Sequence, residues 1–63
     1  MNYKKEASDF IYDHERYKYK EIAAKEAKFL KVDRNTLNPL EGLSFVSIAY
    51  YKLTSGKIVG IVF

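Results

Sequence analysis

The spacing of apolar side chains changes near residue 43, and this change divides the chain into two parts. From Asp9 to about Val32, apolar residues recur every three or four positions, which is the spacing of an amphipathic helix. The runs Phe45–Leu53 and Ile58–Phe63 are instead dense in Phe, Val, Ile and Tyr, which favour strands. We therefore predict an α+β fold for residues 1–63 as a single small domain: a long N-terminal helix, then a loop and a C-terminal antiparallel β-hairpin.

The predicted helix carries two apolar stripes. It contains neither Pro nor Gly, and Ser8 is placed to cap its first turn. One broad face holds Ile11, Tyr12, Tyr19, Ile22, Ala23, Phe29 and Leu30. Nearly opposite lie Tyr3, Ala7, Phe10, His14, Tyr17 and Ala24. A helix that packs on a sheet buries only one face, so the second stripe is either a binding surface for a partner or a set of half-exposed aromatic residues.

The predicted hairpin turns at residues 54–57, where Gly56 can supply the positive φ of a tight turn. A two-residue turn places Tyr51 opposite Gly60, and a three-residue turn shifts every pair by one. In either register both faces of the hairpin are largely apolar, and one helix covers only one of them. We expect a second copy of the chain to cover the rest, as a homodimer. The alternative is a monomer that caps the second face with its loop leucines, which are Leu37, Leu40 and Leu43.

The connection Lys31–Gly42 has two interpretations. In one it is a structured loop, interrupted by Pro39. In the other, Ala27–Leu37 forms a helix-turn-helix in which Asp33 caps the second helix and its first turn, residues 34–36, meets base edges. Together with the terminal hairpin, this stretch resembles the small Cro-type phage repressors, and the resemblance implies DNA binding. Lys31 at the turn and Pro39 shortly after it depart from that pattern.

Charge adds a weak indication of nucleic-acid binding. The chain has eleven basic and eight acidic residues, a formal charge of +3, and most of both signs are interspersed within residues 1–34. Such mixing is typical of a solvated surface, although Tyr and Lys alternate between Arg16 and Lys20, as in a surface that stacks bases and binds phosphates. The candidate nucleic-acid-binding residues are Lys18, Lys20, Lys28, Lys31, Arg34 and Asn35. The candidate residues for contact with other chains are Tyr3, Phe10, His14, Tyr17, Ile58, Ile61 and Phe63.

Several classes of chemistry are not expected from this composition. The chain has no Cys and a single His, so we expect no disulfide, zinc site or other metal site, and the scattered glycines form no phosphate-binding loop. We expect no cofactor and no enzymatic activity, a cytoplasmic location, and no membrane segment. The expected function is a small binding module that self-associates through its hairpin and binds nucleic acid. The alternative is a protein-binding regulator or inhibitor that uses the second aromatic stripe of the helix.

Overall fold

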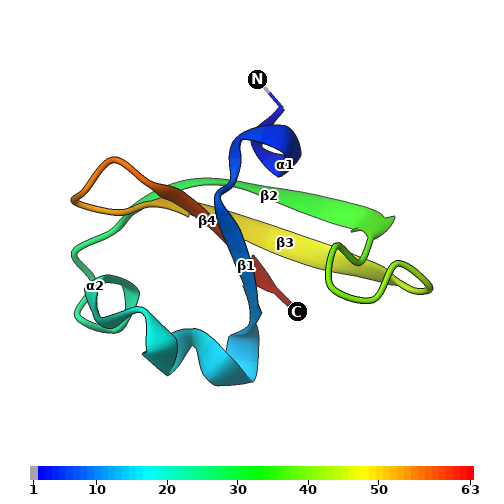
Figure 1. Cartoon of the computed structure of the whole chain (residues 1–63), viewed down its shortest axis with the longest axis horizontal. Helices are drawn as coiled ribbons and strands as arrows, with labels where there is room; N and C mark the ends of the chain where they lie inside the picture. The colour runs from blue at the N-terminus through cyan, green and yellow to red at the C-terminus, as the bar shows by residue number, and fades with distance from the viewer. Residues whose placement is uncertain (1) are drawn as a thin grey trace.

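The computed structural model describes residues 2–63, which form one four-stranded mixed sheet in the order β1–β4–β3–β2 (Figure 1). The strands are β1 (Asp9–Tyr12), β2 (Lys28–Leu37), β3 (Phe45–Lys52) and β4 (Ile58–Val62). The helical segments of these residues are α1 (Tyr3–Glu6), the 3-10 helix η1 (Asp13–Lys18) and α2 (Lys20–Ala23). α1 packs beside one face of the sheet, and α2 beside the other. The sheet is therefore the middle layer of the molecule.

Residues 9–32 do not form the predicted long helix. They divide into β1, η1, α2 and the first half of β2, and η1, with six residues, is the longest helical segment within residues 2–63. α2 ends in a Schellman motif: the N–H of Glu26 donates to the carbonyl of Glu21 over 2.8 Å, and the N–H of Lys25 to that of Ile22 over 3.0 Å. Lys25 has the left-handed φ of 61° that glycine usually supplies there. Because no glycine marks this stop, the helical spacing of apolar residues in the sequence continues through it.

The C-terminal hairpin forms as predicted, in the second of the two registers. Tyr51 pairs with Val59 and Tyr50 with Gly60, which corresponds to a three-residue turn. Gly56 in that turn has φ 91°, a conformation that favours glycine. The hairpin is therefore the part of the fold that could be predicted from the residues of the turn and the composition of the strands.

Both edges of the hairpin are paired within the chain. β1 runs parallel to β4, with Ile11 opposite Ile61, and β2 runs antiparallel to β3, with Val32 opposite Ala49. The cover expected from a second copy or from the loop leucines thus comes from the N-terminal half of the same chain. The loop leucines are exposed. The prediction of a dimer assumed that the hairpin is uncovered in one chain, and this assumption is wrong. Self-association through another surface remains a prediction.

One core lies on the face of the sheet beside α1, here called the α1 face. Ile48, Tyr50 and Val62 are buried together there. The rings of Tyr3 and Phe10 pack against Tyr50, with centroids 5.6 and 6.4 Å from it. Two residues of the predicted partner-binding stripe are therefore core residues of this face.

The second core lies on the opposite face, here called the α2 face. Ile11, Ala49 and Ile61 are buried there, and Tyr19 and Ile22 pack on them from the α2 side. Both faces of the hairpin are apolar because each face packs against its own helical segment. The two apolar sides noted in the sequence therefore match two cores within one chain.

The stretch Ala27–Leu37 is neither a structured loop nor a helix-turn-helix, because β2 occupies residues 28–37. Its pairing with β3 shifts register between Phe29 and Lys31 and again beyond Asp33. Asn35, next to the second shift, has φ 55°. These irregularities disturb the strict alternation of apolar and polar side chains that would have revealed a strand in the sequence.

The loop between β2 and β3 is held in a defined conformation by hydrogen bonds of Asn38. The buried Asn38 donates its N–H to the carbonyl of Ser44 over 2.8 Å and accepts the N–H of Gly42 over 2.7 Å on its own carbonyl. Its side-chain Oδ1 accepts the N–H of Leu40 over 2.9 Å. The loop therefore holds a defined shape while Leu43, at 95% exposure, projects into solvent.

Candidate nucleic-acid interface

A groove crosses the α2 face where η1 and α2 leave the sheet uncovered. It consists of two adjoining hollows, of about 410 and 280 Å³, which share Arg16, Ile22 and Tyr51. Its sheet side is apolar and includes Val32 and Ala49. The groove thus combines an apolar floor from the strands with side chains from η1 at its rim.

Two phenylalanines stand at the groove with much of their rings in solvent. Phe29 is 53% exposed and Phe63 is 55% exposed. The ring of Phe29 packs edge-on against Tyr51, with a centroid distance of 5.6 Å and an interplanar angle of 67°. An exposed aromatic face on a rigid strand can stack a flat ring of a ligand.

Two cationic side chains lie along the same groove. Arg16 lines both hollows, and Lys25 lines the larger one together with Tyr17. The guanidinium of Arg16 is 3.8 Å from the carboxylate of Asp13, and both side chains are mostly exposed, so this contact holds it only weakly. Arg16 and Lys25 are thus available to a negatively charged ligand at the edge of the apolar floor.

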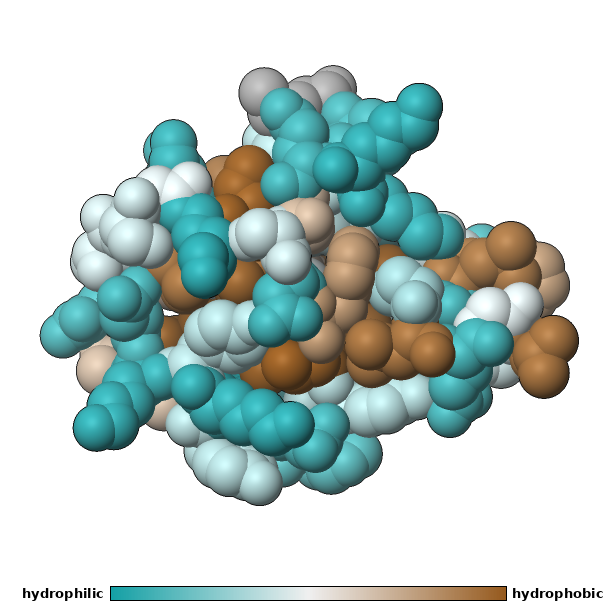
Figure 2. Space-filling view, viewed as in Figure 1, coloured by the Kyte–Doolittle hydropathy of each residue, from teal (hydrophilic) through white to brown (hydrophobic). Residues whose placement is uncertain are grey.

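The net charge of the chain lies at one end of the sheet, on both of its faces. Residues 13–28 and 52–57, which form η1, α2, the start of β2 and the β3–β4 turn, hold seven of the eleven basic residues and four of the eight acidic ones. The rest of the chain is balanced. Figure 2 shows polar side chains over the α2 end of the molecule and apolar ones at the opposite end, where the β2–β3 loop lies. The net charge of +3 therefore lies at the α2 end of the sheet, divided between its two faces, and Arg16 and Lys25 are the cations of that end that line the groove.

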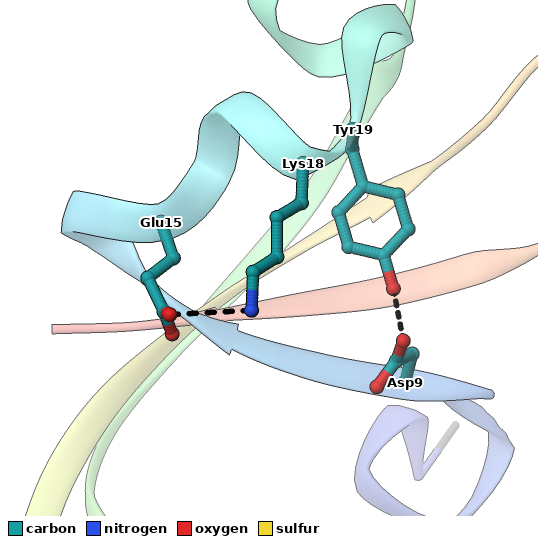
Figure 3. A network of polar contacts seen from close by, with 4 residues as sticks. All are labelled: Asp9, Glu15, Lys18 and Tyr19. Atoms are coloured by element: carbon teal, nitrogen blue, oxygen red, sulfur yellow. Dashed lines mark hydrogen bonds and ion pairs between the residues drawn. The ribbon is translucent and has the colours of Figure 1, made fainter.

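Two polar contacts stabilise the segment that contains η1 and leads into α2 (Figure 3). The hydroxyl of Tyr19 donates to the carboxylate of Asp9 on β1. Lys18 contacts Glu15 at 3.2 Å, three residues away, a spacing at which side chains eclipse in a 3-10 helix. Burial, and then the bond to Asp9, raises the pKa of Tyr19 to about 12. The Tyr19 hydroxyl therefore stays protonated, and keeps donating, throughout the neutral range.

The predicted nucleic-acid-binding residues do not share one surface. Lys31 contacts Asp33 at 3.0 Å on β2, and the β2–β3 register places this pair, like Lys28 and its partner Lys52, on the α1 face. Arg34 and Asn35 lie at the second irregularity of β2, not at the start of a recognition helix. The predicted set is therefore split between the two sides of the sheet and an irregular stretch of strand.

Lys18 and Lys20 are brought together in a separate hollow of about 270 Å³. Lys57 from the β3–β4 turn also lines it, as does Glu21. The carboxylate of Glu21 accepts the N–H of Thr54 over 3.1 Å, which joins α2 to that turn. These lysines therefore line a hollow of their own, which shares no lining residue with the groove.

The predicted contact residues are also dispersed. Beyond the two in the α1-face core, His14 stacks on Tyr12 at 5.5 Å, and Ile61 is buried in the sheet. Ile58 is half-buried, whereas Tyr17 and Phe63 are exposed. The aromatic stripe that was to bind a protein partner is not a surface, because the helix that would have aligned it does not form.

No family model, curated protein or solved structure matches this chain. Residues 2–63 contain no group of three or more His, Asp or Glu side chains placed to hold a metal ion. No helix among them is long and apolar enough to cross a membrane. The function of this chain is therefore inferred from its own structure and charge.

Proposed function

We propose that this protein binds single-stranded nucleic acid in the groove of the α2 face. The observation that carries the proposal is the placement of exposed aromatic rings, Phe29 and Phe63, beside the cations Arg16 and Lys25. Single strands are bound in this way when bases stack on aromatic side chains and phosphates lie along basic ones. The net charge of +3, carried by the α2 end, favours the same ligand.

A single strand fits this groove better than a duplex does. Stacking on Phe29 or Phe63 requires the flat face of a base, and in a duplex those faces are covered by neighbouring bases. The groove has no helix that could enter a major groove, because η1 and α2 are short and packed on the sheet. The proposal therefore keeps the nucleic acid expected from the sequence and replaces both the residues and the mode of binding.

Strain at Lys25 supports the assignment. A residue other than glycine with φ 61° costs on the order of 1–2 kcal/mol, and such strain is often found at functional sites. A lysine at this position places a cation at the groove, which a glycine cannot do. The chain thus carries a locally unfavourable residue where the proposed site needs a charge.

Replacing Lys25 with glycine is expected to separate stability from binding. Lys25→Gly should raise the free energy of unfolding by about 1 kcal/mol, because glycine adopts the positive φ without strain. It should also weaken binding of a labelled oligonucleotide about threefold, because one phosphate contact is lost. Urea denaturation and fluorescence anisotropy measure the two effects. A variant that is stabilised but binds as well as the wild type would remove Lys25 from the site.

The proposal itself is tested by anisotropy with a fluorescent ten-nucleotide single strand at about 50 mM salt and nanomolar to micromolar protein. We expect binding that weakens steeply with salt, and weaker binding to a duplex of equal length. Phe63→Ala should reduce affinity roughly 5- to 30-fold through lost stacking. Arg16→Gln should reduce it severalfold and lower the salt slope by about one unit.

Arg34→Gln provides the matched control, because it removes the same charge from an exposed position of β2 that does not line the groove. We expect Arg34→Gln to bind nearly as the wild type does. Absence of binding at low salt would overturn the proposal. Equal losses for Arg16→Gln and Arg34→Gln would also overturn it, since binding would then follow total charge and not the groove.

A further inference from the structure

An apolar strip extends the groove along the α2 face. Strand register places Phe45 opposite Leu37 and on the same side of the sheet as Ala49, and Phe63, which exchanges backbone hydrogen bonds with Ser47, falls on that side too. Phe45 is 66% exposed and Leu37 48% exposed. Together with Phe29 these side chains form the strip Phe29, Leu37, Phe45 and Phe63. The strip holds four of the seven large apolar side chains that are exposed within residues 2–63.

The edges of the sheet are poorly suited to pairing with another copy. β2 is irregular at two places along its length, and such bulges hinder the addition of a further strand. The other edge is β1, which is only four residues long. Contact between copies is therefore more favourable across a face of the sheet than along an edge.

Charge favours the α2 face for such a contact. Along the β2–β3 ladder, Lys28, Lys31, Asp33 and Lys52 all fall on the α1 face. The strip on the α2 face is therefore free of these charged side chains, and the cations Arg16 and Lys25 lie at its groove end. Sheets that pack face to face interdigitate side chains of this kind, about 10 Å apart.

We propose that, without a ligand, two copies pack their strips together around a two-fold axis and close each other's nucleic-acid groove. A two-fold axis brings Phe45, at the loop end of one copy, toward Phe29 and Phe63 at the groove of the other. This inference rests on the proposed function, because it makes self-association and nucleic-acid binding mutually exclusive. The dimer thereby regulates access to the groove.

The size of the strip sets the strength of this dimer. Burying the exposed parts of the strip removes on the order of 400 Å² of solvent-accessible surface per copy, if a whole aromatic side chain accounts for roughly 200 Å². A standard protein interface buries about 800 Å² per partner, so the contact is weak and reversible. A weak dimer is what competition requires, since a short oligonucleotide must be able to displace the second copy.

Light scattering and sedimentation between about 10 µM and 1 mM protein test the dimer without any nucleic acid. We expect the mass to rise from 7.4 kDa toward twice that value as concentration increases. Phe45→Ser should keep the chain monomeric over this range. Leu43→Ser is the matched control, because Leu43 is more exposed than Phe45 but lies in the loop and not on the strip. It should dimerise as the wild type does.

A wild-type mass that stays at 7.4 kDa up to 1 mM would overturn the dimer, and loss of dimer in Leu43→Ser alone would overturn the assigned face. Adding an equimolar ten-nucleotide strand to the dimer should give one chain per strand. A complex of two chains on one strand with the dimer intact would overturn the masking of the groove. Anisotropy at nanomolar protein, where the chain is monomeric, tests the proposed function separately, so either idea can fail alone.

Discussion

Gly60→Ala is expected to lower the free energy of unfolding by about 3 kcal/mol, the upper end of the range for overpacking a core. Gly60 is buried in the middle of β4. An added Cβ would lie 2.6 Å from Cδ1 of Phe10 and 2.9 Å from Cγ2 of Ile48, and non-bonded carbon atoms in proteins do not come this close. The ring of Phe10 is itself packed on Tyr50, so it has little room to move. Urea denaturation followed by far-UV circular dichroism measures the loss.

Substitutions at Gly56 serve as a comparison, because there the backbone conformation disfavours other residues although a side chain has room. A Cβ at Gly56 would meet nothing within 4 Å, but its φ of 91° disfavours other residues. We therefore expect Gly56→Ala to cost about 1 kcal/mol and Gly56→Asn less, because Asn tolerates positive φ. Gly60→Asn should be worse than Gly60→Ala. A smaller cost for Gly60→Ala in a Phe10→Leu background would show that the ring is the obstacle.

The part of the fold that could be predicted is the part set by local chemistry. Phe45–Phe63 is rich in residues that favour strands, and Gly56 is placed for the turn, so the hairpin followed from the sequence. The register was ambiguous because the apolar pattern fits both registers. The three-residue turn decides between them through backbone geometry that composition does not contain.

The N-terminal half could not be predicted because tertiary contacts override its local preferences. Residues 20–28 are rich in Ala, Lys and Glu, and only one turn of α-helix survives, ended by Lys25 without a glycine. The hairpin exposes two edges and two apolar faces, and β1, β2 and the helical segments satisfy all of them. The free energy of covering the hairpin therefore outweighs helical propensities of a few tenths of a kcal/mol per residue.

The candidate site was missed for the same reason. Phe29 was assigned to the core stripe of a helix, and Lys25 was not among the predicted site residues. Of the residues at the groove, Tyr17 and Phe63 were among the predicted contact residues, and both are exposed. Arg16 stood in the Tyr–Lys alternation, which was the one useful signal, but the groove brings it to strands that are distant in sequence. A site assembled from η1, β2 and the last residue of the chain has no local motif.

Ile11→Ala is expected to cost about 2–5 kcal/mol, as truncation of a buried isoleucine does when the surrounding structure relaxes only in part. Ile11 is 6% exposed and pairs with Ile61 in the parallel β1–β4 ladder. Its neighbour Phe10 points to the opposite face, where it packs against Tyr50. Phe10→Ala should therefore also be strongly destabilising, by about 3 kcal/mol or more. If replacement of either of two consecutive residues strongly lowers the free energy of unfolding, the strand is covered on both faces, because successive side chains of a strand point to opposite faces.

His14→Ala is the matched control for both variants, because His14 is exposed on η1 just beyond β1 and should cost less than about 1 kcal/mol. Unfolding is measured at about 5 µM protein, well below the concentration at which the proposed dimer forms, so every loss belongs to the monomer. A small effect of Phe10→Ala beside a large one of Ile11→Ala would mean that only one face of β1 is covered. The segment would then behave as the amphipathic helix that its spacing predicts, and the four-stranded sheet would be wrong at its first strand.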